Sequence, residues 1–111
     1  MSRTTPLTYE VLLALSDADL HGYGIIKEID ARGGAAPSTG ALYLALQRME
    51  GDGLIEEAPG RPAAAEDDAR RRYYRITARG REAAELESIR LAELVATARS
   101  KKLLPAVGGR G

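Results

Sequence analysis

The sequence has no cysteine, no tryptophan and no phenylalanine, and His21 is its single histidine. The lack of cysteine excludes disulfide scaffolds, thiolate metal sites and cysteine nucleophiles. One histidine cannot form a histidine metal cluster, and no paired carboxylates stand beside a candidate nucleophile. We therefore expect a protein that is not an enzyme and that binds no cofactor or metal.

Long apolar runs are also missing. No run approaches the roughly 18 residues of a membrane span, and residues 1–6 lack the apolar core of a secretion signal. We therefore expect a cytoplasmic protein with no membrane partner. A chain of 111 residues fits one domain with a modest core, and domains of this size often gain stability by forming oligomers.

An excess of positive charge is absent as well, because 16 basic and 16 acidic residues cancel. Nucleic-acid-binding domains are usually basic, so the net charge does not support DNA binding. Whether the charge supports DNA binding therefore depends on how the charged residues are distributed along the chain.

Two short helices are predicted before residue 35. The first begins at Thr5 or Thr8 and ends before residues 16–19, and the second follows His21 and ends at residues 33–34, which are both glycine. We expect His21 to cap or pack against the start of the second helix.

Gly22 and Gly24 stand in the first turn of that second helix. A glycine in a helix interior costs up to about 1 kcal/mol relative to alanine. We therefore expect another backbone to approach them closely, either that of the first helix or that of DNA at the helix N-terminus.

Residues 38–50 predict a third helix with two different faces, which Ser38 can cap. Residues at helical spacing form a buried stripe of Leu42, Ala45, Leu46 and Met49. The opposite face carries Gly40, Leu44, Gln47 and Arg48, with Tyr43 on its flank. Such a face has no carboxylate and suits a phosphate-lined groove, although most amphipathic helices are ordinary surface helices.

A β-hairpin is predicted after this helix. Residues 54–58 are short and partly β-branched, and residues 71–76 alternate so that Tyr74 and Ile76 point inward and a basic row points outward. Residues 59–69 between them include two prolines and an acidic run at residues 66–68. This composition predicts a long, mobile loop with an acidic tip.

Thr77 can cap a last helix of about 25 residues. Its apolar residues form two stripes that a single short domain cannot easily cover together, so we expect one stripe to bind a second copy of the chain. Which stripe does so is left open. The dimerisation candidates in the two stripes are Leu86, Ile89, Leu91, Leu94, Val95 and Ala98.

The predicted order of elements is that of a winged helix-turn-helix with an added dimerisation helix. Residues 70–81 contain six arginines and no carboxylate, so the neutral total hides a local basic patch. Guanidinium groups on a hairpin suit DNA phosphates. A solvated strand face is the alternative interpretation of the same residues.

Several motifs in this order and spacing resemble the PadR family of transcriptional regulators. They include residues 21–25 (HGYGI), residues 38–43 (STGALY) and residues 73–80 (YYRITARG). This family consists of dimeric bacterial winged-helix repressors that bind operator DNA and often release it when a small molecule binds. The resemblance implies that Ser38, Gly40 and Tyr43 touch DNA and that residues 70–72 belong to the wing.

The sequence therefore predicts a mainly α fold with a small β-hairpin, in which residues 1–77 form a winged helix-turn-helix, residues 78–104 a dimerisation helix and residues 105–111 a disordered tail. The expected partners are double-stranded operator DNA, a second copy of the chain and a small-molecule effector. The expected DNA contacts are Ser38, Thr39, Gly40, Tyr43, Gln47, Arg70, Arg71 and Arg72. The alternative is a dimeric winged-helix interaction module without DNA binding, which the neutral net charge and the acidic loop favour.

Overall fold

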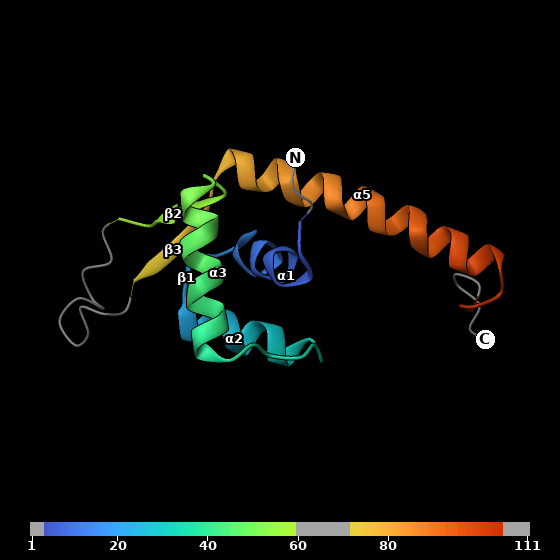
Figure 1. Cartoon of the computed structure of the whole chain (residues 1–111), viewed down its shortest axis with the longest axis horizontal. Coiled ribbons are helices and arrows are strands. Elements are labelled where there is room, and N and C mark those ends of the chain that lie inside the picture. The colour runs from blue at the N-terminus through green and yellow to red at the C-terminus, as the bar shows by residue number, and fades with distance from the viewer. Residues whose placement is uncertain (1–3, 60–71, 106–111) are drawn as a thin grey trace.

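The computed structural model describes residues 4–59 and 72–105 of the chain (Figure 1). Its elements are α1 (Pro6–Leu15), β1 (Leu20–His21), α2 (Gly22–Ala31), α3 (Thr39–Gly51), β2 (Ile55–Glu57), β3 (Tyr73–Ile76) and α5 (Ala78–Ser100). This is the mainly helical winged fold with a long last helix that the sequence predicts. The expected acidic loop tip and the end of the tail lie outside the described residues.

Each helix begins where the sequence supplies a capping group. Side-chain oxygens of Thr5, Ser38 and Thr77 accept hydrogen bonds from backbone N–H groups three residues further on, at 3.1, 3.1 and 3.0 Å. His21 caps α2 through Nδ1, which accepts a hydrogen bond from the Gly24 N–H at 2.9 Å. The prediction that His21 lies at the start of α2 and caps it is confirmed.

Glycines with left-handed backbone geometry follow the ends of α2 and α3. Gly33 has φ 84° and Gly53 has φ 79°, values that L side chains rarely adopt. The chain therefore leaves each helix sharply, and the predicted turn at residues 33–37 separates α2 from α3.

The helices and the sheet enclose one hydrophobic core. Its buried members are Val11, Leu12, Ala14, Leu15, Ile25, Ile29, Leu42, Leu46, Met49, Ile55 and Tyr74. The predicted inward stripe of α3 is confirmed at its three large residues, and Ala45 is half-buried beside them. Burial stabilises each such large apolar side chain by about 1.5–3 kcal/mol, so the stripe fixes which face of α3 points outward.

Within residues 4–59 and 72–105 the sheet has three antiparallel strands in the order β1-β3-β2, rather than the two of the predicted hairpin. Leu20 pairs with Tyr74 in β1·β3, and Ile55 pairs with Ile76 in β2·β3. Tyr74 is buried and Ile76 is half-buried, as the alternation predicts. Two-residue β1 was not predicted because an alternation of two residues is too short to recognise in a sequence.

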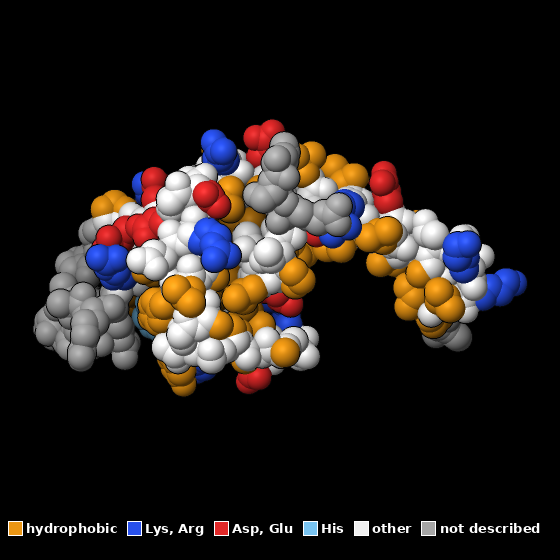
Figure 2. All heavy atoms as spheres, in the orientation of Figure 1, with side chains coloured by type: hydrophobic (Ala, Val, Ile, Leu, Met, Phe, Trp, Pro, Cys, Tyr) orange, Lys and Arg blue, Asp and Glu red, His pale blue; other side chains and the backbone are white. Residues whose placement is uncertain are grey.

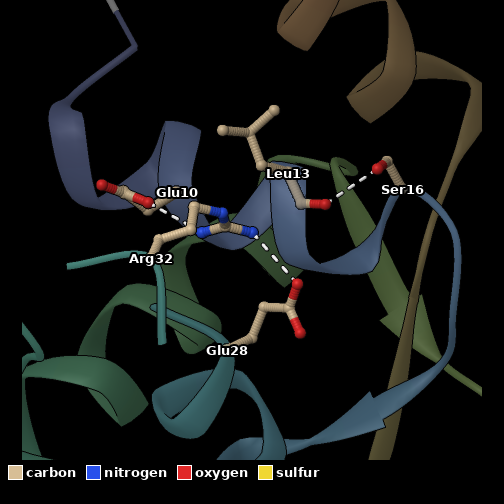
Figure 3. Close-up of polar contacts among 5 residues, drawn as sticks. All are labelled: Glu10, Leu13, Ser16, Glu28 and Arg32. Carbon is tan, nitrogen blue, oxygen red and sulfur yellow. Dashed lines mark hydrogen bonds and ion pairs between the residues drawn. The ribbon is translucent and has the colours of Figure 1, made fainter. Parts of the chain in front are cut away.

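An ion-pair bridge ties the end of α2 to α1 (Figure 3). The Arg32 guanidinium donates to Glu10 of α1 at 3.0 Å and to Glu28 of its own helix at 3.4 Å. All three side chains are about one-third or more exposed, so each pair contributes about 0–1 kcal/mol. The bridge therefore adds little to the stability of the fold.

The start of α5 is fixed to the segment before β2. The Thr77 hydroxyl donates to the Gly53 carbonyl oxygen at 2.6 Å, and the Thr77 N–H donates to the Leu54 carbonyl oxygen at 3.1 Å. A Cβ atom on Gly80 would collide with that Leu54 carbonyl oxygen. Glycine is therefore required where the first turn of α5 crosses the backbone before β2.

Further along, α5 packs on α1 and then extends away from the body of the molecule (Figure 1). The Tyr9 hydroxyl of α1 lies 2.7 Å from Ser88 Oγ, which itself donates to the Ala84 carbonyl oxygen. Neither predicted apolar stripe of α5 is fully covered, since Leu94 of one stripe is 53% exposed and Ile89 of the other is 57% exposed. That one of the stripes binds a second copy of the chain stays a prediction.

Candidate nucleic-acid interface

The outward face of α3 is the centre of the candidate interface. Ser38, Thr39, Gly40 and Gln47, all expected to contact DNA, are exposed. The first turn of α3 holds no acidic residue, and Arg48 in its last turn is exposed too. This face offers hydrogen-bonding groups and one positive charge, as phosphates and base edges require.

Tyr43 lies on the flank of this face and is 44% exposed. Its ring edge and hydroxyl pack against Gly22, where a Cβ atom would collide with the hydroxyl oxygen. The expectation that the backbone of the first helix approaches these glycines is therefore wrong: a side chain of α3 approaches Gly22, and the nearest groups to a Cβ on Gly24 are the side chains of His21 and Leu20. The approach of a DNA backbone stays a prediction. Tyr43 thus connects the start of α2 to the outward face of α3.

Aromatic side chains gather beside this contact at the start of α2. The His21 ring lies 5.1 Å from the Tyr73 ring in an edge-on arrangement and 6.4 Å from the Tyr23 ring. Lys27 Nζ lies 5.5 Å from the centre of the Tyr23 ring. His21 is therefore held by its cap and by aromatic neighbours, an arrangement typical of a structural residue.

The base of the wing, where β2 ends and β3 begins, carries both positively and negatively charged side chains. Arg70 and Arg71 lie outside the described residues, and Arg72 is exposed just before β3. A hydrogen bond to the Tyr74 hydroxyl, together with the nearby Glu57 carboxylate, raises the pKa of Arg72. Burial raises the pKa of Tyr74, and the hydrogen bond from Arg72 partly opposes that rise.

Two arginines of the predicted basic patch at residues 70–81 already have partners within the chain, so they are less available to bind phosphate than the sequence indicates. Arg75 Nε donates to a Glu56 carboxylate oxygen at 2.7 Å, because antiparallel pairing places Glu56 opposite Arg75. Arg81 donates to the Ser16 carbonyl oxygen at 2.8 Å. A stretch without carboxylates in the sequence therefore gains one from the neighbouring strand, which the register of the sheet reveals and the spacing along the chain does not.

Comparison with protein-family models decides what kind of protein carries this surface. The model described as the transcriptional regulator PadR-like family matches residues 11–86. The chain belongs to the PadR-like family. It is thus a member of a family of transcriptional regulators and not of an enzyme class.

Solved structures of PadR-like regulators share the fold. A PadR family regulator from hypervirulent Clostridium difficile R20291 superposes with a TM-score of 0.73 at 25% identity, covering 86% of this chain and 97% of that one. A PadR-like regulator from Bacillus cereus strain ATCC 14579 gives a TM-score of 0.65 at 26% identity, covering 90% and 92%. The long last helix and the small sheet are therefore features of known PadR-like structures.

A curated protein also matches in sequence. It is the uncharacterized 37.1 kDa protein in transposon TN4556 of Streptomyces fradiae, which is 38% identical over 92 residues. The match covers 83% of this PadR-like chain but only 25% of that protein, so the chain spans about a quarter of its length.

A groove of about 850 Å³ runs between α1, α3 and α5 of this PadR-like chain. Its lining includes Arg48, Arg79, Glu82 and Leu86, and thus carries both charges beside apolar groups. In the same lining, Arg90 donates to the buried Glu87 carboxylate at 2.6 and 3.0 Å, which raises the pKa of Arg90. Residues 4–59 and 72–105 contain no cluster of side chains that could hold a metal ion and no helix that could cross a membrane.

Proposed function

We propose that the chain is a homodimeric, sequence-specific DNA-binding regulator, and that it represses transcription until a small-molecule effector releases it from its operator. The observation that carries this proposal is the outward face of α3, which presents uncharged polar groups and Arg48 but no acidic group in its first turn. In a winged helix-turn-helix this helix enters the major groove. The proposed contacts there are Ser38, Thr39, Gly40, Tyr43 and Gln47.

The wing is proposed to contact the DNA backbone through Arg70, Arg71 and Arg72. Arg72 supports this role, since it is exposed and its hydrogen bond to Tyr74 holds it at the start of β3. Arg75 is not proposed as a contact, because its guanidinium already pairs with Glu56. Phosphate contacts of this kind position the protein without reading sequence.

Dimerisation is proposed through residues 78–104, with residues 1–77 as the DNA-binding unit. The support is the apolar surface exposed along α5 (Figure 2), where Leu86 is 63%, Ile89 57%, Leu94 53% and Val95 40% exposed. Together with the half-buried Leu91 and Ala98, these residues place apolar side chains along the length of α5, and exposed apolar patches mark protein interaction sites.

Effector binding is proposed at the groove between α1, α3 and α5. Its volume of about 850 Å³ falls within the usual range for small-molecule sites. It touches both Arg48 of the DNA-facing helix and Leu86 of the proposed dimer helix. A ligand there would contact the two parts of the molecule that an operator complex must hold in a fixed relation.

The test is a gel shift with the promoter region of the protein's own gene and with random duplex DNA of equal length. We expect the promoter DNA to be bound at a lower protein concentration than the random DNA. Freshly purified protein absorbs in the near ultraviolet through five tyrosines alone, so its spectrum reports co-purified nucleic acid sensitively. A dimer that retards neither DNA would instead be a winged-helix interaction module.

A further inference from the structure

Leu44 is the one large aliphatic side chain on the outward face of α3, and it is 65% exposed. Scattered exposed leucines are ordinary in folded proteins, so exposure alone assigns no role. The position of Leu44 is more informative. At about 100° per residue it stands close to opposite the buried stripe of α3, between Gln47 and Arg48, and thus near the centre of the proposed DNA-facing surface.

The direction of the side chain brings it toward the part of α3 that meets base edges. Side chains on a helix lean toward its N-terminus, so Leu44 covers the preceding turn, which contains Gly40. A Cβ atom on Gly40 would meet no atom within 4 Å. The first turn therefore has open space in front of it, and a base edge can approach until it touches the Leu44 methyl groups.

Base chemistry then selects the partner. Among the four bases, thymine alone presents a methyl group in the major groove, and apolar side chains recognise it there. The N-terminal residues of a recognition helix are those that contact base edges. We infer that Leu44 is a specificity-determining residue that packs against the C5-methyl group of a thymine in each half-site. This inference rests on the proposed function and adds a base identity to it.

A protein partner fits this face less well. A protein-docking surface needs a contiguous apolar patch of several hundred Å². Here Leu44 is flanked by Gly40, Gln47 and Arg48, and Tyr43, the nearest large apolar neighbour, packs against Gly22. One aliphatic group among hydrogen-bonding and cationic groups matches a base edge between phosphates.

The experiment removes the methyl group from the DNA. An operator is first selected from a random duplex library, and each thymine is then replaced by deoxyuridine, which keeps the hydrogen-bonding edge. We expect one thymine position in each half-site to be sensitive. A single replacement at that position should weaken binding of the unaltered protein about fourfold, which corresponds to about 0.8 kcal/mol for one buried methyl group. Leu44→Ala should bind the thymine and deoxyuridine operators equally.

Asp30→Ala is the control variant, because Asp30 is exposed in α2 and belongs neither to the proposed DNA contacts nor to residues 78–104. It should keep the fourfold discrimination. Leu44→Ala should keep the melting temperature, since an exposed side chain leaves no cavity.

Two results would overturn the inference while DNA binding itself stands. The first is an operator in which no deoxyuridine replacement weakens binding, and the second is an equal loss for Leu44→Ala and the unaltered protein. If the unaltered protein selects no DNA from the library, the proposed function fails and the inference fails with it.

Discussion

Tyr43 combines two environments in one residue. Its ring packs on Gly22 at the start of α2, whereas almost half of the side chain stays exposed beside the outward face of α3. No residue within 4–59 and 72–105 forms a hydrogen bond with its hydroxyl. The hydroxyl is therefore available to DNA at low cost to the fold.

Tyr43→Phe tests that role by removing the hydroxyl and keeping the ring. If the hydroxyl donates to a phosphate, DNA binding should weaken by about 0.5–3 kcal/mol, equally for operator and random sequence, because phosphates carry no base code. Gel shifts on both DNAs measure this loss, and the melting temperature should hold. Lowered stability with unchanged DNA affinity would place Tyr43 in the core instead.

The raised pKa of Tyr74 leads to a prediction of how the stability of the protein depends on pH. Burial raises its pKa in the folded protein, whereas an unfolded tyrosine ionises near about pH 10. Above that pH the unfolded chain has lost the proton and the folded protein still holds it, so stability is full below pH 10 and falls as pH rises toward the folded pKa.

Tyr74→Phe should remove this alkaline loss. Urea unfolding of both proteins between pH 8 and pH 11 measures it as a change in the difference between their free energies of unfolding. The unaltered protein should lose stability relative to Tyr74→Phe only above about pH 10. A constant difference across the range would show that Tyr74 ionises alike in both states.

At the scale of elements, the contact between α5 and the backbone before β2 has a sharp steric requirement. Gly80→Ala places a methyl group against the Leu54 carbonyl oxygen and should lower the free energy of unfolding by about 1–3 kcal/mol. Gly51→Ala is the matched control, because a Cβ there meets no atom within 4 Å and alanine favours a helix by up to about 1 kcal/mol. Urea denaturation should give the highest free energy of unfolding for Gly51→Ala, an intermediate value for the unaltered protein and the lowest value for Gly80→Ala. Any other order contradicts the packing.

The wing is the second element with a quantitative expectation. Replacing Arg70, Arg71 and Arg72 by Gln should weaken binding to all sequences and flatten the slope of log affinity against log salt by up to about 0.9 per lost phosphate contact. Arg75→Gln is the control, because its ion pair with Glu56 already occupies it. An unchanged slope in the triple variant would place the wing in solvent within the complex.

Local signals predicted most of the elements, and long-range pairing explains what they missed. Caps at Ser38 and Thr77 and the stripe on α3 depend on neighbours within a few residues, so they can be read along the chain. Two-residue β1 and the Glu56–Arg75 pair exist because distant segments meet in the sheet. Likewise, Gly22 is explained only by Tyr43, which lies one helix later in the chain.

At the scale of the whole molecule, the single chain is more extended than a compact domain of its length. Its radius of gyration is 16.2 Å, against about 13 Å for a compact domain of this size. The excess comes from α5, which reaches beyond the core (Figure 1). An extended helix with exposed leucines is the arrangement that a second copy of the chain would complete.

Leu94→Glu and Ile89→Glu test dimerisation, because each places a charge in a different apolar stripe of α5. At least one should sediment as a monomer and weaken operator binding, since two half-sites about one helical turn apart must be bound together. Leu44→Glu, an equally exposed position on α3, should leave the mass unchanged. If both α5 variants keep the dimer mass, the interface lies elsewhere.

The tie between the start of α5 and Gly53–Leu54 turns the long helix into a rigid arm without a hinge at its base. Helix α5 has 23 residues and is therefore about 35 Å long. Because its first turn is bonded to the residues before β2, any rotation of α5 turns the sheet and the end of α3 with it. In the proposed dimer the two arms would cross among residues 86–98, about 20 Å from the start of α5. A change of about 10° there would move the start of each α5, and the DNA-reading head bonded to it, by about 4 Å relative to successive major grooves.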